Sequence, residues 1–365
     1  MTKVPAEAAT KRANTSAVPV RRRLRAAGGS LHPPQGSGGR VWSAGGERTP
    51  RKDAGRSPVA FLFPGQGSQA VGMGEDLCAR FAVAREIFTQ ADDILRFPLS
   101  ALCFEGPLEE LTLTVNTQPA LLTASCALAR VIETELHLSP SWTAGHSVGE
   151  FSALVVAGAL TFPDALRLVR ERGRAMQAAV APGVGSMAAV LGLDLERITA
   201  ICQQAAEGQV VSPANLNGGG QIVIAGHREA VERAATLANN SGARRVIPLA
   251  VSAPFHCALM APAAERLRAA LEPVTVSPLR CPVITNVEAR ACTDAGRIKE
   301  LLVRQAVSPV RWQECIEELA RLGCRDAIEV GPGRVLSGLS RRIAPDIRCV
   351  AGEDLVAVRG AVASP

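Results

Sequence analysis

The sequence predicts an α/β fold in which a large domain is interrupted by a smaller subdomain. Residues 145–149, Gly-His-Ser-Val-Gly, have the G-x-S-x-G spacing of a nucleophile elbow, the tight turn between a strand and the helix that follows it. Residues 186–251 read as strand, helix, strand, strand, helix, strand, which is the ferredoxin-like order. We therefore expect an α/β-hydrolase-like large domain with an inserted ferredoxin-like subdomain at residues 183–250.

The composition is that of a globular protein with a large core. Of 365 residues, 47% are hydrophobic, yet no run of eighteen apolar residues is present, so we expect no membrane insertion. The net charge is +6, but residues 1–57 hold twelve Lys/Arg and three Asp/Glu, a net +9, which leaves the remainder at −3. A slightly acidic body argues against a nucleic-acid-binding protein.

The first 57 residues have the composition of an organellar targeting segment. They are rich in Arg, Ala, Gly and Ser, poor in acidic residues, and lack the apolar core of a secretory signal. We interpret them as a mitochondrial transit segment, which predicts a location in the matrix. A disordered basic tail and a nuclear address at Arg21-Arg22-Arg23 are the alternatives. The ten cysteines contain no C-x-x-C pair and suit a reduced compartment, and Cys257 is expected to be a buried apolar residue.

The first part of the large domain is expected at residues 58–182. An apolar strand at 59–63 leads into the glycine-rich turn Pro64-Gly65-Gln66-Gly67-Ser68-Gln69. Gln118-Pro119 is expected to open a long helix at 120–136, with the proline at a first-turn position. Further helical stretches are expected at 73–93, at 108–135, directly after the elbow, and at 162–180.

The remaining elements follow from the alternation of apolar and polar segments. In the subdomain, strands are expected at 186–193, 210–216, 221–225 and 245–251, and helices at 195–207 and 229–239. The second part of the large domain, residues 251–351, is expected to contain strands at 283–286, 327–330 and around 349, and helices at 298–305 and 311–321. Residues 352–365 are expected to form a C-terminal tail.

Ser147 is the candidate nucleophile. The glycines on either side of it are needed because the turn brings backbone so close that a Cβ would clash. The apolar helix that follows would place the Val148 N–H and the positive end of the helix dipole near an oxyanion. Gln66 could reach the same oxyanion. An ordinary glycine-rich turn is the alternative at both places.

A nucleophilic serine needs a base, and His256 is the candidate that remains after elimination. Of the five histidines, His32 lies in the leader, His137 ends a helix among polar residues, and His227 opens a helix in the subdomain. His146 precedes the serine, where adjacent side chains point apart. No Asp or Glu stands out as the group that orients the imidazole, so a backbone or amide acceptor and a Ser–His dyad are expected.

The motifs together resemble one enzyme family over residues 58–351. They are Phe63-Pro64-Gly65-Gln66-Gly67-Ser68-Gln69, Gly145-His146-Ser147-Val148-Gly149-Glu150, Arg172-Gly173-Arg174, Phe255-His256 and Glu329-Val330-Gly331-Pro332-Gly333. The chain resembles the malonyl-CoA:acyl carrier protein transacylases of type II fatty acid synthesis, in their mitochondrial form. It is also similar to the acyltransferase domains of fatty acid and polyketide synthases.

The resemblance implies a role for each matching residue. Ser147 would take the malonyl group as an ester, with His256 as general base and then general acid. Gln66 and the Val148 N–H would bind the oxyanion, and Arg172 would pair with the malonyl carboxylate. Without the resemblance, Arg172 belongs to a strongly charged helix in which most of the charged side chains are expected on a solvated face, which leaves open that one of them has another role.

Three further positions match the family less directly. Gln305 matches the residue whose backbone carbonyl orients the histidine. Phe255 matches the malonyl-selecting form of its motif, where methylmalonyl-selecting domains carry serine. Asn217 falls where the family lines the pocket with asparagine, but here Gly218-Gly219-Gly220 follows in place of the usual serine-proline-glycine, which leaves the loop conformation open.

The expected reaction transfers malonyl from malonyl-CoA to the phosphopantetheine thiol of acyl carrier protein. Neither a cofactor nor a metal is implied, and Arg341 and Arg342 are candidates for steering the acidic carrier, unless they are a solvated helix end. The oligomeric state is not predicted, and a monomer is compatible with the sequence. A serine esterase or thioesterase using the same elbow is the alternative enzyme, and a non-catalytic carrier-binding scaffold is the alternative without chemistry.

Overall fold

A six-stranded sheet forms the centre of the computed structural model, which describes residues 58–251 and 253–363. The strand order is β10-β9-β1-β2-β7-β8, and every neighbouring pair is parallel except β7 and β8. The strands are β1 (Val59–Phe63), β2 (Trp142–Gly145), β7 (Val283–Ile284), β8 (Ala291–Cys292), β9 (Asp326–Glu329) and β10 (Arg348–Ala351). The predicted strands of the large domain are therefore present, with shorter bounds at β7.

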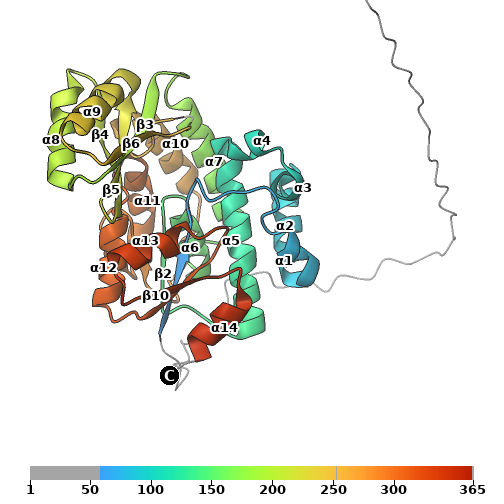
Figure 1. Ribbon diagram of the computed structural model, residues 1–365. Helices are drawn as coiled ribbons and strands as arrows, with labels where there is room; N and C mark the ends of the chain where they lie inside the picture. The colour runs from blue at the N-terminus through green and yellow to red at the C-terminus, as the bar shows by residue number, and fades with distance from the viewer. Residues whose placement is uncertain (1–57, 252, 364–365) are drawn as a thin grey trace, which may run out of the picture. The chain divides into compact units, whose positions relative to one another are not determined.

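Strand β1 lies in the middle of this sheet because both of its faces are apolar. All five of its residues are buried, as is typical of a strand covered by helices on both sides. Ala60 and Leu62 belong to the core formed with α12 (Trp312–Arg321) and α13 (Val335–Ile343). Helix α6 (Gly149–Val156) contacts β1 and β2 and connects them to the long helix α5 (Thr114–Leu136) (Figure 1).

The remaining helices of the large domain surround this core. They are α1 (Glu75–Arg80), α2 (Ala82–Leu95), α3 (Leu99–Glu105), α4 (Leu108–Thr112), α7 (Phe162–Ala178), α10 (Ala261–Leu271), α11 (Ile298–Val307) and α14 (Leu355–Ala363), with 3₁₀ turns η1 (Ala258–Met260) and η2 (Ala295–Arg297). Thr161 caps α7 by accepting a hydrogen bond from the Asp164 N–H at 3.2 Å, which explains why that helix begins at Phe162.

The expected start of the long helix was wrong. Helix α5 begins at Thr114, and Pro119 lies in its interior. Proline has no N–H to donate to the carbonyl four residues earlier, which here is the Val115 oxygen. Arg170 of α7 donates to that oxygen at 3.0 Å, so the neighbouring helix supplies the hydrogen bond that the proline removes.

The C-terminal segment also differs from the expected tail. Residues 355–363 form α14, in which Val358 and Ala361 are buried. Asp354 holds the first turn, because its side chain accepts from the Ala357 N–H at 2.9 Å and its carbonyl accepts from the Val358 N–H. Apolar residues at a spacing of three after an N-capping aspartate were the signal for this helix.

The inserted segment forms a separate four-stranded antiparallel sheet. Its order is β4-β5-β3-β6, with β3 (Gly185–Leu191), β4 (Val211–Gly218), β5 (Gln221–His227) and β6 (Arg245–Pro248). Helices α8 (Leu195–Ala206) and α9 (Arg228–Asn240) pack on this sheet around a core of their own (Figure 1). The predicted α/β fold with an inserted ferredoxin-like sheet is confirmed, although β6 ends at residue 248 and not at 251.

Strand β4 connects this sheet to the large domain. Asn215 forms a parallel bridge with Val310, the Leu216 N–H donates to the Val310 oxygen at 2.8 Å, and the Val310 N–H donates to the Ala214 oxygen at 2.9 Å. Val310 lies two residues before the start of α12. The backbone thus couples β4 to the loop between α11 and α12, next to the elbow.

Two sequence expectations concern targeting and membrane insertion. The transit segment at residues 1–57 lies outside the described residues. Within residues 58–251 and 253–363, no helix combines the length and the apolar character that crossing a bilayer requires.

Candidate active site

The elbow has the geometry that its glycines require. Ser147 adopts a φ of 52°, a left-handed conformation that is strained for a residue with a Cβ. A Cβ on Gly145 would lie 1.9 Å from the backbone carbon of Gly149, and a Cβ on Gly149 would lie 2.2 Å from the Phe63 oxygen. Neither contact is sterically possible, so both positions must be glycine. The turn between β2 and α6 therefore presents the Ser147 hydroxyl at the sheet end, as predicted.

Ser147, His256 and Gln305 form a hydrogen-bonded chain. The Ser147 Oγ lies 2.7 Å from His256 Nε2, and His256 Nδ1 lies 2.9 Å from the Gln305 backbone oxygen. A carbonyl oxygen only accepts, so Nδ1 carries the ring proton and Nε2 is left to accept from the serine hydroxyl. The orienting acceptor is thus a backbone carbonyl, and the arrangement is a Ser–His dyad.

His256 is held in its neutral form. Its side chain lies in the interior, with 3% of the residue exposed, and its backbone φ is 60°. Burial first, and then the positive charge of Arg172, lower the pKa of the imidazole to about 3, while the bond to the Gln305 oxygen opposes both effects. A neutral imidazole at physiological pH is able to accept the serine proton at once.

Arg172 is not part of the solvated face of its helix. It is 2% exposed, and its guanidinium donates to Gln118 Oε1 at 2.9 Å, to Gln305 Oε1 at 2.9 Å and to Ser147 Oγ at 3.1 Å. Burial lowers the pKa of this group to about 10, while the charge of Glu150 raises it. Its Nε–H has no hydrogen-bond acceptor in the described part of the chain. A buried cation with a spare donor beside the nucleophile is suited to binding an anionic ligand.

The side chains of Asn286, Gln305 and Glu150 form hydrogen bonds to the elbow and to one another. Asn286 accepts from the Ser147 N–H at 2.8 Å and donates to the Gly145 oxygen at 2.7 Å, so it holds both sides of the elbow. Glu150 Oε2 accepts from the Asn286 N–H at 3.0 Å and from Gln305 Nε2 at 2.8 Å. Gln305 Nε2 also donates to the Ser147 oxygen at 3.0 Å.

Sequence reasoning missed three residues that bond to the elbow, to Gln305 or to Arg172, namely Glu150, Asn286 and Gln118. Glu150 is part of the elbow motif but received no role, although an acidic residue in the first turn of the helix that follows Ser147 was an available signal. Asn286 and Gln118 come from β7's end and from the interior of α5, and nothing local in the sequence marks them. Their contacts arise from tertiary structure.

The two predicted oxyanion residues lie beside the elbow. A Cβ on Gly65 would lie 2.6 Å from the His146 oxygen, so the Gln66 turn packs directly against it. The Gln66 amide nitrogen donates to Thr114 Oγ1 at 3.3 Å. Val148 is the N-cap of α6, and its backbone is helical. The turn is therefore in place, while oxyanion binding by either residue stays a prediction.

Asn217 reaches the site through His146. Its Oδ1 lies 2.9 Å from His146 Nε2, and the imidazole packs against Trp312 with 5.5 Å between the ring centroids and an angle of 57° between the ring planes. The side chain of His146 thus points away from the dyad, as expected, and connects the elbow to β4. The three glycines after Asn217 all have positive φ angles, 78°, 59° and 73°, which gives a tight β4–β5 hairpin.

The two remaining predicted positions adjoin His256. Phe255 is buried and directly precedes the histidine, but no contact assigns it to a substrate pocket. Cys257 is buried, its thiol donates to the Pro254 oxygen at 3.1 Å, and burial raises the pKa of the thiol to about 11. Cys257 is therefore an unreactive packing residue, as predicted.

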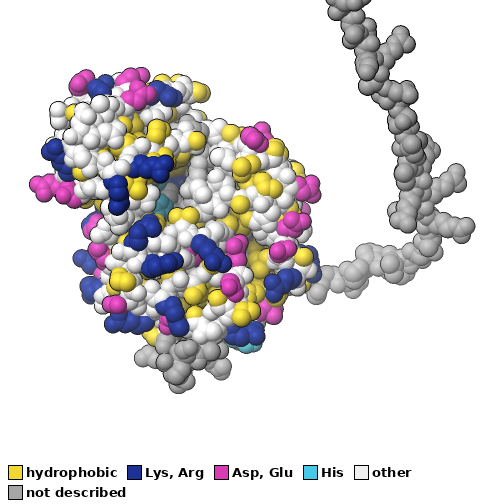
Figure 2. All heavy atoms as spheres, viewed as in Figure 1, with side chains coloured by type: hydrophobic (Ala, Val, Ile, Leu, Met, Phe, Trp, Pro, Cys, Tyr) yellow, Lys and Arg dark blue, Asp and Glu magenta, His cyan; other side chains and the backbone are white. Residues whose placement is uncertain are grey.

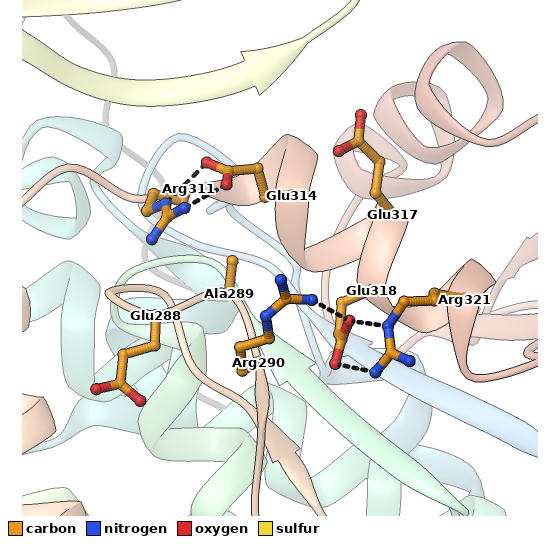
Figure 3. Close-up of a pocket in the computed structure, with 8 residues that line it drawn as sticks. All are labelled: Glu288, Ala289, Arg290, Arg311, Glu314, Glu317, Glu318 and Arg321. Atoms are coloured by element: carbon orange, nitrogen blue, oxygen red, sulfur yellow. Dashed lines mark hydrogen bonds and ion pairs between the residues drawn. The ribbon is translucent and has the colours of Figure 1, made fainter.

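A separate pocket of about 400 Å³ lies between the β7–β8 turn and α12. Figure 3 shows Arg290 and Arg321 pointing toward Glu318 from two sides, at 2.8 and 2.7 Å. Arg311 is likewise paired with Glu314. Since each of its arginines faces a glutamate, we assign no chemistry to this pocket. No group of three or more metal-ligating side chains occurs among residues 58–251 and 253–363.

Comparison with known proteins identifies the family to which the chain belongs. The family model described as the acyl transferase domain matches residues 60–342. A malonyl CoA-acyl carrier protein transacylase of Salmonella typhimurium is 49% identical over 303 residues, which cover 83% of this chain and 98% of that protein. The crystal structure of an acyl carrier protein S-malonyltransferase from Vibrio cholerae is 49% identical, with a TM-score of 0.80 over 83% of this chain and all of that one.

One of the similar solved structures also contains an acyl-carrier protein. A malonyl-transacylase bound to a type II polyketide synthase acyl-carrier protein is 47% identical, with a TM-score of 0.81 over 84% of this chain and 99% of that one. The fold and the Ser–His dyad define a serine-nucleophile acyltransferase. The chain belongs to the acyl transferase domain family, and within it to the malonyl CoA-acyl carrier protein transacylases.

Proposed function

We propose that the protein transfers a malonyl group from malonyl-CoA to the phosphopantetheine thiol of acyl carrier protein, supplying fatty acid synthesis. The observation that best supports this activity is the contact of Arg172 with Ser147 Oγ at 3.1 Å. It places a buried cation beside the atom that would hold the acyl group. A carboxylate carried by that acyl group would pair with the guanidinium, whose two parallel donors match it.

The transfer takes place in two half-reactions on one serine. The Ser147 hydroxyl gives its proton to His256 Nε2 as Oγ attacks the thioester carbonyl, and the collapsing intermediate releases CoA thiolate, which takes the proton from His256. In the second half, the pantetheine thiol gives its proton to His256 and its sulfur attacks the malonyl ester. Ser147 then leaves as an alkoxide and recovers the proton. The chain's own residues suffice for both halves, so we expect no cofactor.

Substrate binding would also activate the base. The charge of Arg172 is one of the causes that lower the pKa of His256. A carboxylate bound to Arg172 offsets that charge and allows the pKa of the imidazole to rise in the complex. An oxyanion would form beside the Val148 N–H and the Gln66 amide, which we assign as its donors.

Hydrolysis by the same dyad is the alternative reaction, and it has less support. The relatives described above are transferases, and we expect the bound substrate, together with the buried His256 and Arg172, to exclude water from the ester. A malonyl ester protected from water persists until the second thiol arrives. The same burial therefore favours transfer.

Intact mass after mixing the protein with malonyl-CoA tests the function. We expect a stable gain of one malonyl group in the wild type and none in Ser147→Ala, which should remain folded because Ala is smaller than Ser. Unchanged mass with release of free malonate would indicate a hydrolase. Unchanged mass with intact malonyl-CoA would indicate a protein that only binds its carrier.

The carrier is expected to dock where the two sheets meet. Figure 2 shows Lys and Arg side chains around the hollow between the inserted subdomain and the large domain. Arg342 lies in this region, because a Cβ on Gly219 of the β4–β5 turn would be 2.9 Å from its Nε. Together with Arg341 at the end of α13 it would attract an acidic carrier.

We also propose that residues 1–57 direct the protein to the mitochondrial matrix. The support is their composition, twelve basic and three acidic residues without an apolar core. A variant that begins at Pro58 is expected to keep full transferase activity, because such a segment cannot bury a core. A fluorescent tag at the C-terminus should mark mitochondria for the full chain and not for the shortened one. Nuclear fluorescence, or loss of activity in the shortened chain, would contradict the assignment.

A further inference from the structure

Glu150 is a buried acidic residue beside the dyad, and the proposed reaction leaves it without a role. It lies on α6, one turn after Ser147, and is 2% exposed. Its Oε2 accepts from Gln305 Nε2 at 2.8 Å, while Oε1 of the same Gln305 amide accepts from Arg172 at 2.9 Å. One amide group thus connects the carboxyl group of Glu150 to the guanidinium of Arg172.

Within residues 58–251 and 253–363, Glu150 is the one carboxyl group whose charge raises the pKa of Arg172. The three side chains that accept its hydrogen bonds, Gln118, Ser147 and Gln305, are all uncharged. The negative charge of Glu150 raises the pKa of Arg172 and so opposes the loss of its proton. In the free protein, Glu150 is therefore the counter-charge of Arg172, with the Gln305 amide between them.

We propose that Glu150 determines specificity by competing with the substrate carboxylate for Arg172, so that malonyl binding requires Glu150 to take up a proton. The proposal rests on the proposed function, because it needs an acyl group with a carboxylate. Two anions would otherwise face one buried guanidinium, and a like charge in a poorly solvated site favours the neutral form of the weaker acid. The substrate carboxylate bonds Arg172 directly, whereas Glu150 acts through the amide. Glu150 is therefore the group that becomes protonated.

The surroundings of Glu150 place this proton exchange near neutral pH. Burial raises the pKa of its carboxyl to about 7, and the bonds from Gln305 and Asn286 and the charge of Arg172 oppose that rise. The groups that face it are Arg172 from α7, Gln305 from α11, Asn286 after β7 and the Cys315 thiol from α12. The pKa of Cys315 is raised well above its usual value by burial and then by Glu150, so this thiol stays neutral. His256, behind Gln305, is neutral as well.

The direction of the pH effect follows from these assignments. Below pH 7 Glu150 is neutral and Arg172 is available to the malonyl carboxylate, whereas above pH 7 Glu150 is charged and competes. The ratio of kcat/KM for malonyl-CoA to kcat/KM for acetyl-CoA should therefore fall between pH 6 and pH 8. The expected fall is about threefold to tenfold, since the protonated fraction drops about tenfold per pH unit above the pKa. Since kcat/KM reports the ionisation of groups in the free enzyme, the ratio cancels the titration of Ser147 and His256, which act on both substrates.

Glu150→Gln separates this role from a structural one. The amide oxygen of glutamine can accept both bonds that Oε2 accepts, so the variant keeps the geometry and removes the charge. We expect its malonyl-to-acetyl ratio to vary less than about twofold between pH 6 and 8, and to exceed the wild-type ratio at pH 8. Glu329→Gln is the matched control, because Glu329 is fully buried and bonds the start of α13 at Leu336 and Ser337. That variant should keep the wild-type slope.

The outcomes of these experiments distinguish a failure of the role proposed for Glu150 from a failure of the proposed function. A wild-type ratio that does not change with pH overturns it, and this measurement needs no variant to fold. A Glu150→Gln ratio with the wild-type slope overturns it as well, and so does loss of the slope in Glu329→Gln. If the wild type forms no malonyl adduct, the proposed function fails first. If the adduct forms and the slope is absent, only the role of Glu150 fails.

Discussion

Replacing His256 with alanine is expected to slow formation of the malonyl-enzyme by roughly 10²–10⁴-fold. The imidazole is the acceptor of the Ser147 proton, at 2.7 Å, and its other nitrogen is already bonded to the Gln305 oxygen. Arg172 also contacts Ser147 Oγ, but a guanidinium donates and cannot take up a proton. The variant therefore has no base, and rapid-quench measurement of malonyl-enzyme formation should show the loss.

His137 provides the control for this experiment. It ends α5 with a φ of 50°, in a conformation that asparagine tolerates well. His137→Asn should keep normal acylation, and both variants should show wild-type circular dichroism. Normal acylation in His256→Ala, together with its loss in His137→Asn or His227→Ala, would show that elimination among the histidines chose the wrong residue.

The parts of the fold that the sequence predicted are those with a local chemical signal. The elbow was predictable because Gly145 and Gly149 leave no space for a Cβ, and this requirement is visible in the residue types. The inserted sheet was predictable because its strands and helices alternate with clear changes of period. Both signals lie within a few residues of the structure they specify.

The error at the start of the long helix arose because a distant residue overrides a local preference. Pro119 was expected to start a helix because proline lacks an N–H, but Arg170 replaces the missing donor from another helix. Contacts between distant parts of the chain also limit what the sequence predicts about the site. Ser147 and Arg172 lie in recognisable motifs, whereas Gln118 and Asn286 contact Arg172 and Ser147 only because α5 and β7 pack beside the elbow. The role of Gln305 was predicted from the family resemblance, because its residue type alone did not indicate a role.

Replacing Arg172 with alanine is expected to lower kcat/KM for malonyl-CoA by about tenfold to a hundredfold. A hydrogen bond to a charged group contributes roughly 1.5–3 kcal/mol, and about 1.4 kcal/mol corresponds to one decade of rate. Acetyl-CoA should lose far less and could gain, because an acetyl group leaves the buried cation unpaired in the wild type. Arg172→Lys should recover only part of the malonyl activity, since an ammonium cannot donate two parallel bonds to a carboxylate.

Arg174 separates substrate binding from support of the helix. It lies on the same helix as Arg172, but it is exposed, so Arg174→Ala should leave both activities near the wild-type values. The measurement is kcat/KM for malonyl-CoA and acetyl-CoA on the wild type and the three variants. A structural role for Arg172 would reduce both activities equally, because its bonds to Gln118 and Gln305 hold α7 against α5 and α11. A carboxylate-binding role reduces only the malonyl activity. Equal losses would therefore assign Arg172 to the scaffold and leave malonyl selection without a residue.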